Sequence, residues 1–118
     1  MLVPDHPTDV LICRYWGFRE GHTGESLAGA RRVLRHDVTS YLASELDALG
    51  PVPKVARSCP QFGGRSELFI FRYPDGGTAR VLLIMAGCIP VTNGRVLRDG
   101  LDLRFRAGEL HWPDEGLL

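Results

Sequence analysis

The sequence contains almost no lysine or asparagine: Lys54 and Asn93 are the only residues of their types. Positive charge is therefore carried almost entirely by arginine, whose guanidinium is a rigid, forked donor. Lys+Arg and Asp+Glu are both 14, so the net charge is zero. A protein that binds nucleic acid is expected to carry a basic surface, and this balance predicts none.

Long apolar runs are also lacking, and no stretch reaches the length needed to span a membrane. The N-terminus shows no charged n-region followed by an apolar h-region, so no signal peptide is visible in it. Residues 1–8 are expected to form a linker and residues 113–118 a flexible tail. The 118 residues suit one domain with a modest core.

Motifs that carry cofactor or metal chemistry are missing as well. There is no glycine-rich phosphate loop and no serine in a nucleophile-elbow pattern. The histidines are scattered along the chain, without the close spacing of metal ligands: His6, His22, His36 and His111. Cys13 has no histidine beside it in the sequence to act as a base. We therefore predict no catalytic residue, no metal and no cofactor.

What the sequence does contain is a strong hairpin signal. Apolar runs at Leu68–Tyr73 and Val81–Met85 flank a turn-forming Pro74-Asp75-Gly76-Gly77 segment. An earlier apolar run, Asp9 to Phe18, reads as a buried strand. Further strands are expected at Arg95–Arg98, after an Asn-Gly turn, and at Leu101–Arg106, which alternates.

One long helix is predicted between the first strand and the hairpin. Ser26 is its expected N-cap, and Gly50-Pro51 supplies a stop signal. Apolar residues recur between them at intervals of mostly three and four: Leu27, Ala30, Val33, Leu34, Val38, Tyr41, Leu42, Leu46 and Leu49. The predicted fold is α+β, with this long amphipathic helix packed on an antiparallel sheet of about four to six strands.

Both faces of the predicted hairpin are apolar, but one helix covers only one face of a sheet. We expect the other face to be covered by terminal segments or by a partner, which is another protein or a second copy of the chain. The candidate interface is the face of Phe69, Phe71 and Tyr73.

Three cysteines are present. Two of them flank the hairpin where its ends meet, because Cys59 precedes its first strand and Cys88 follows its second. A disulfide between them is geometrically natural, and it would leave Cys13 over. In an oxidising compartment the leftover thiol would be free and buried or linked to another chain. In the cytosol all three would be reduced.

Taken in order, several short segments resemble small, uncharacterised actinobacterial secreted or envelope proteins and lipoproteins. The segments are Cys13-Arg14-Tyr15, Leu46 to Leu49, Cys59-Pro60, Tyr73 to Gly76, and Gly87-Cys88 with Val91 to Gly94. The resemblance covers most of the chain up to about Arg95. It implies secretion, with a signal or anchor removed from the N-terminal side, and a Cys59–Cys88 bond.

A fainter resemblance is to the Streptomyces subtilisin-inhibitor family, whose reactive-site loop follows a Cys-Pro pair. The matching positions are Cys59-Pro60-Gln61-Phe62, with Cys88 as the partner cysteine. The resemblance implies that Gln61 precedes the scissile bond and Phe62 follows it. The second disulfide of that family is missing here, and its helix matches poorly.

The prediction from sequence is a non-enzymatic secreted or cell-envelope domain that binds a protein or another ligand. The first alternative is a serine-protease inhibitor that presents Pro60, Gln61 and Phe62 in a tethered loop. The second alternative is a small enzyme or ligand-binding pocket between helix and sheet.

Overall fold

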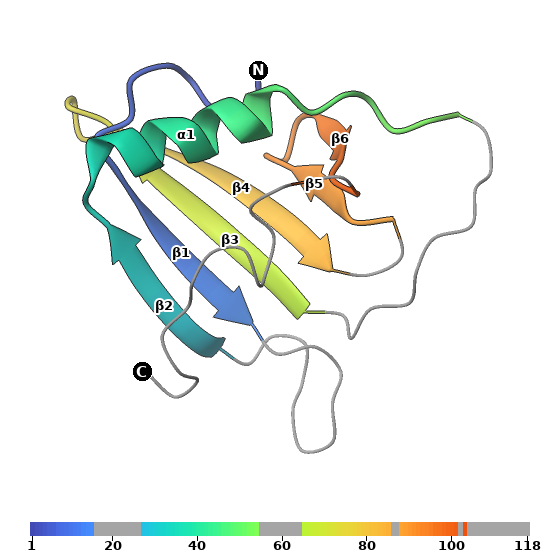
Figure 1. Cartoon of the computed structure of the whole chain (residues 1–118), viewed down its shortest axis with the longest axis horizontal. Helices are drawn as coiled ribbons and strands as arrows, with labels where there is room; N and C mark the ends of the chain where they lie inside the picture. Colours follow the sequence, from blue (N-terminus) through green and yellow to red (C-terminus); the bar gives the residue numbers. More distant parts are fainter. Residues whose placement is uncertain (16–26, 55–64, 86–87, 102, 104–118) are drawn as a thin grey trace.

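In the part of the chain that the structure describes, six strands form one antiparallel sheet, and a single helix lies across one of its faces (Figure 1). The computed structural model describes residues 1–15, 27–54, 65–85, 88–101 and 103. The spatial order of the strands is β2-β1-β3-β4-β5-β6. Their bounds are β1 Asp9–Tyr15, β2 Leu27–Val33, β3 Arg65–Arg72, β4 Thr78–Met85, β5 Pro90–Thr92 and β6 Leu97–Asp99, and helix α1 spans His36–Asp47. The predicted α+β class and antiparallel sheet are confirmed.

The predicted hairpin is β3 and β4, joined by the turn that the sequence indicated. The Gly76 amide donates to the Tyr73 carbonyl at 3.0 Å, and the Asp75 carboxylate accepts the Gly77 amide at 2.8 Å. Gly76 has a φ of 86°, a left-handed conformation that glycine adopts without a Cβ clash. The turn chemistry therefore fixes the register of the two strands, in which Phe69 pairs with Val81.

The Asn-Gly segment also forms a turn, between β5 and β6. The side-chain oxygen Oδ1 of Asn93 accepts hydrogen bonds from the backbone amides of Arg95 and Val96, each at 2.9 Å, and Gly94 has a φ of 92°. The strand predicted at Leu101–Arg106 is not seen in its described part. The Leu103 amide donates to the Gly100 carbonyl, which makes a turn, and residues 102 and 104–106 lie outside the described residues.

The long helix is a wrong prediction, because its first part is strand β2 and only α1 is helical. Leu27–Val33 pairs with β1 as an edge strand, and Ala30 lies opposite Cys13. Apolar residues at intervals of three do not exclude a strand, and Gly29 lowers helix propensity by about 1 kcal/mol relative to alanine. The predicted N-cap, Ser26, lies outside the described residues.

Helix α1 is 12 residues long and buries one stripe. Its buried residues follow the i, i+3, i+4, i+7 spacing of a helix face: Thr39, Leu42, Ala43 and Leu46. Asp37 lies in the first turn, where the helix dipole favours a carboxylate, and it forms an ion pair with the N-cap residue Arg35 at 2.7 Å. The helix ends at Asp47, just before the predicted Gly50-Pro51 stop.

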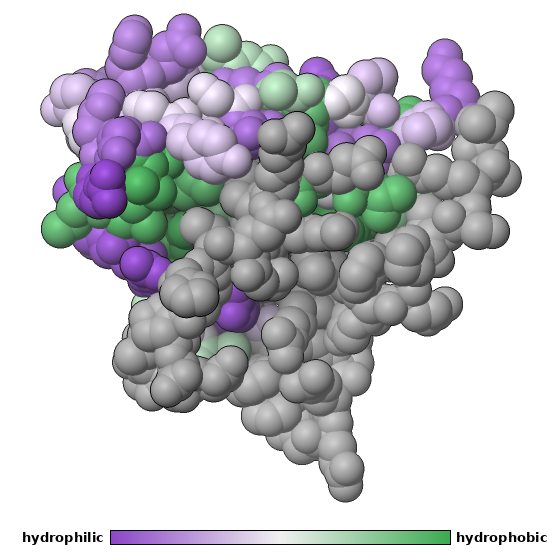
Figure 2. Space-filling view, in the orientation of Figure 1, coloured by the Kyte–Doolittle hydropathy of each residue, from purple (hydrophilic) through white to green (hydrophobic). Residues whose placement is uncertain are grey.

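The core lies between α1 and the sheet. Phe69 and Phe71 are both 0% exposed, with ring centroids 6.5 Å apart, and they are joined there by buried residues of neighbouring strands: Val10, Ile12, Val81, Leu83 and Val91. The outer surface along the top of the molecule, over α1, is mostly hydrophilic, and hydrophobic atoms lie beneath it where helix meets sheet (Figure 2). The amphipathic helix thus seals one face of the sheet.

The N-terminal segment also packs into the core, which differs from the linker predicted for residues 1–8. Leu2 is 3% exposed and Val3 is 0% exposed. The Val3 amide donates to the Asp47 carboxylate at 2.8 Å, and the Tyr73 hydroxyl donates to the Pro4 carbonyl at 2.8 Å. Two buried side chains and these hydrogen bonds hold the segment against the helix and the β3–β4 turn.

Candidate functional site

The side of the sheet that faces away from α1, here called the open face, is the main candidate surface. Residues paired across neighbouring antiparallel strands point to the same side. The register pairs Cys13 with Leu68, Leu68 with Leu82, and Leu11 with Ile70. The open face therefore carries six partly exposed apolar residues on the three central strands: Leu11, Cys13, Leu68, Ile70, Leu82 and Ile84.

Apolar character continues to both edge strands. Leu27 pairs with Tyr15 and is 48% exposed on β2, and Leu97 pairs with Thr92 and is 51% exposed on β6. Among the described elements, the only helix lies on the opposite face. A sheet that is apolar on both sides is normally covered on both sides. Among the surfaces that the described residues form, the open face is therefore the one best suited to contact another molecule.

The predicted interface residues lie elsewhere, and this is a correction. Phe69 and Phe71 are fully buried under α1, on the face that the helix already covers. The Tyr73 hydroxyl is bonded to the N-terminal segment. A strand alternates its side chains, so a shift of one residue exchanges the two faces. Leu68 and Ile70 alternate with these two phenylalanines along β3, and their side chains are the partly exposed ones on the open face.

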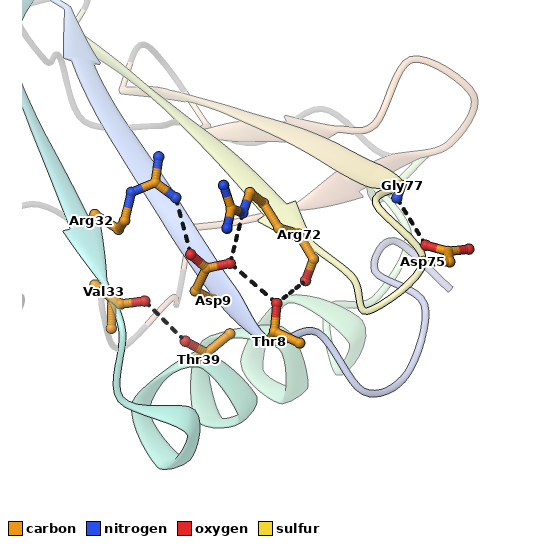
Figure 3. Close-up of polar contacts among 8 residues, drawn as sticks. All are labelled: Thr8, Asp9, Arg32, Val33, Thr39, Arg72, Asp75 and Gly77. Carbon is orange, nitrogen blue, oxygen red and sulfur yellow. Dashed lines mark hydrogen bonds and ion pairs between the residues drawn. The ribbon is translucent and has the colours of Figure 1, made fainter.

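A charged cluster lies at the end of the open face where β1 begins and β3 ends (Figure 3). Asp9 of β1 sits between two arginines from the neighbouring strands. Its carboxylate accepts from Arg32 Nη1 at 3.0 Å and from Arg72 Nε at 3.0 Å, and the Thr8 hydroxyl donates to it at 3.2 Å. Three adjacent strands, β2, β1 and β3, thus place these groups side by side.

Asp9 is nearly buried, at 5% exposure. Burial raises the pKa of its carboxyl, but the hydrogen bonds from Arg32 and Arg72 outweigh burial and leave the pKa below its ordinary value of 3.8. The carboxylate therefore stays charged at neutral pH and orients both guanidinium groups. Their side chains remain 40% and 56% exposed, so both arginines still present donors to solvent.

Cys13 lies on the open face as a free thiol, half-buried beside Tyr15. Burial raises the pKa of the thiol, and a hydrogen bond with Tyr15 opposes that shift only in part. A nucleophilic cysteine needs a depressed pKa. Cys13 therefore behaves as a small apolar member of this face.

A further ion pair is largely buried on the helix side of the sheet. Arg14 and Glu67 lie opposite each other on β1 and β3. Glu67 Oε2 accepts from Arg14 Nε at 3.0 Å and from Nη2 at 2.9 Å, with the two side chains 1% and 13% exposed, respectively. This pair is largely shielded from solvent and links β1 to β3.

A shallow groove of about 480 Å³ lies between the N-terminal segment and the β3–β4 turn. Burial, together with the nearby carboxylates of Asp47 and Asp5, raises the pKa of Tyr73 to about 12. That hydroxyl is already used to hold the N-terminal segment. His6, which also lines the groove, has a φ of 66° and is exposed.

The other residues predicted to be functional fall mainly outside the described chain. Cys59 and the candidate inhibitory loop, Pro60, Gln61 and Phe62, all lie there. Cys88 is half-buried just before β5. The Cys59–Cys88 pairing and the inhibitor hypothesis stay predictions.

The pocket predicted between helix and sheet is filled by the apolar core wherever the structure describes it. Within the described ranges, no group of three or more His, Cys, Asp or Glu residues could hold a metal ion. No helix among them has the length and apolar character needed to cross a membrane.

Comparison of the chain with models of known families, with curated proteins and with solved structures finds no match. The resemblances to envelope proteins and to subtilisin inhibitors therefore stay predictions. The surface itself is the basis for inferring function.

Sequence reasoning missed the Asp9 cluster because its members are far apart in the chain. A signal for it did exist: Asp9 opens an apolar strand, and such a carboxylate needs a partner when the strand is central. Identifying Arg32 as one partner required recognising Leu27–Val33 as a strand, whereas a helix was predicted there.

Proposed function

We propose that this protein is a non-enzymatic binding domain whose open face binds another protein. One observation carries the proposal: β1, β3 and β4 are apolar on both sides, and α1 covers only one. Partly exposed apolar side chains grouped in one region of a surface are typical of protein-binding sites. We further propose, from the resemblance and the predicted Cys59–Cys88 bond, that the domain works in a secreted or cell-envelope setting.

The chemistry of the open face supports binding rather than catalysis. Its thiol, Cys13, has a raised pKa, and its carboxylate, Asp9, is held as a charged group by two arginines. A general base or nucleophile works best with a pKa near the operating pH. Neither group meets that requirement, whereas both suit a surface with fixed shape and charge.

The test locates the partner and then measures its affinity. A photo-crosslinking amino acid is placed at Ile84, on the open face, and separately at Tyr41, which is 47% exposed on α1. Both variants are expressed in the organism that makes the protein. We expect a specific crosslinked protein from position 84 and not from position 41.

The captured protein is then purified, and its dissociation constant is measured with two variants that share one substitution. Leu82→Glu places a charge in the middle of the open face, whereas Leu34→Glu places it at a site that is 72% exposed elsewhere. Burying an unpaired carboxylate should weaken binding at least about tenfold for Leu82→Glu only. Equal crosslinking from both positions, or equal affinities of the two variants, would refute the proposed function.

A further inference from the structure

The charges of the open face indicate what kind of protein would fit it, an inference that rests on the proposed function. The strand register arranges the face in rows. Asp9 and Arg72 occupy the first row, with Thr78. The second row has an arginine on each side of two apolar residues, in the order Arg32, Leu11, Ile70 and Arg80. The third row is almost wholly apolar: Ala30, Cys13, Leu68, Leu82, Thr92 and Leu97.

The first two rows are unbalanced in charge. Three guanidinium groups face one carboxylate, that of Asp9, which already binds Arg32 and Arg72. Arg80 is exposed and pairs with no carboxylate of the described chain. The nearest turn contributes Asp75, whose carboxylate is bonded to the Gly77 amide beyond the end of the strands. This end of the face therefore attracts anions, although the whole chain has zero net charge.

Two of these three arginines, Arg32 and Arg72, are also held in place before any partner arrives. Asp9 anchors Arg32 and Arg72 at 3.0 Å each, so their remaining donors point in fixed directions. Ordering a long side chain during binding costs about 0.5–1.5 kcal/mol, and groups ordered in advance avoid much of that cost. Guanidinium groups match carboxylates with paired hydrogen bonds. The basic end is thus prepared to bind carboxylates.

We propose that the partner presents an amphipathic helix with an apolar stripe and acidic residues along one flank. Its stripe would cover Leu68, Leu82 and their neighbours, and its carboxylates would meet Arg72 and Arg80. The same sheet already binds such an element on its other side, where the 12-residue α1 packs its apolar stripe on the neighbouring residues of the same strands. A helix of that length extends about 18 Å, which crosses about four strands of a sheet.

A membrane fits these observations less well. The described apolar side chains of the central strands are only partly exposed and lie in a sheet face, rather than protruding as an insertion surface would require. Zero net charge gives little attraction to an anionic bilayer. A lipid surface and a second copy of the chain are therefore outcomes to be distinguished by experiment.

The test uses three synthetic 18-residue helical peptides with the full chain. One has a leucine stripe and a glutamate flank, the second has lysines in place of the glutamates, and the third scrambles the first. Binding is followed through backbone amide shifts in ¹⁵N–¹H spectra. We expect the glutamate peptide to shift amides of β1, β3 and β4, and to bind at least about tenfold more tightly than the lysine peptide. Added salt should weaken binding of the glutamate peptide, because it screens the attraction between opposite charges.

Two variants make the same charge change at different places. Arg80→Glu should weaken binding of the glutamate peptide and strengthen binding of the lysine peptide. Arg95→Glu, at an exposed site in the β5–β6 turn, should change neither. Equal binding of the two peptides, or equal behaviour of the two variants, would overturn the acidic-helix proposal. The crosslinking result and the effect of Leu82→Glu on the captured protein would remain as independent tests of the open face.

Separate measurements test the two alternative partners of the open face, a lipid surface and a second copy of the chain. Sedimentation of anionic vesicles with the protein, reduced by Arg80→Glu, would overturn the proposal in favour of a lipid surface. Concentration-dependent dimers abolished by Arg80→Glu would overturn it in favour of a second copy. Failure of the glutamate peptide to bind better than its scrambled form would also overturn it.

Discussion

Replacing Glu67 tests how the buried ion pair contributes to stability. Its Oε2 accepts two guanidinium hydrogen bonds from Arg14, at 2.9 and 3.0 Å, and the side chain is 1% exposed. Glu67→Ala leaves the guanidinium without that carboxylate in a site that water barely reaches. Removing one partner of a buried pair costs about 3–5 kcal/mol. Domains of this size are stable by only about 5–15 kcal/mol, so the variant should lose a large part of its stability.

Two further variants separate the contributions of charge, hydrogen bond and packing. Glu67→Gln keeps an acceptor near Arg14 but loses the charge, so its cost should be smaller, about 1.5–3 kcal/mol. The double variant Arg14→Met with Glu67→Leu removes both charges and fills the space with apolar atoms. Replacing a whole buried pair in this way is often neutral or stabilising. We therefore expect the double variant to be more stable than Glu67→Ala.

Urea unfolding, followed by circular dichroism, measures all four proteins. With a slope of about 2 kcal/mol per molar urea, a loss of about 4 kcal/mol lowers the midpoint by about 2 M. A Glu67→Ala variant within about 1 kcal/mol of the parent would refute the reasoning. So would a double variant as unstable as Glu67→Ala, since the cost would then come from lost packing rather than from the loss of the carboxylate beside the buried guanidinium.

Three other predictions concern single sites. Gly100→Ala should cost about 1–3 kcal/mol in a thermal or urea melt, because a Cβ there would meet the Ile89 carbonyl at 2.7 Å; Gly50→Ala, with no atom within 4 Å, is the control and should change little. The pKa of Asp9 is lower in the folded protein than its ordinary value of 3.8, so the ionised carboxylate stabilises the fold above pH 3.8. That stabilisation is lost as the pH falls through the lower pKa of the folded state. Asp9→Asn should therefore make stability depend less on pH at the acid end, and an unchanged pH dependence would contradict this. The pKa of Tyr73 is about 12, so its ionisation, followed by absorbance at 295 nm, should occur only well above pH 10, and the protein should lose stability as pH rises from 10 to 12. Asp47→Asn removes a nearby negative charge and should lower that pKa.

Local signals were enough for the hairpins and their turns. A proline-aspartate-glycine segment at Pro74–Gly76 and an Asn-Gly at Asn93–Gly94 have backbone preferences that act within a few residues. The end of α1 was also predictable, because Gly50-Pro51 cannot readily extend a helix. In each of these cases the deciding interaction is local, so the sequence contains it.

The sequence by itself therefore determined the α+β class, the antiparallel hairpins, and the apolar character of both sides of β3. Only the tertiary structure decided which side faces α1: Phe69 is buried and Leu68 is partly exposed, a choice between equivalent apolar rows that depends on what packs against them. Tertiary structure also explains why Leu27–Val33 is a strand. Its pairing with β1 is a long-range interaction, and this pairing overrides a weak helical periodicity. The Asp9 cluster followed from that pairing, since Arg32 reaches the carboxylate only when β2 lies beside β1.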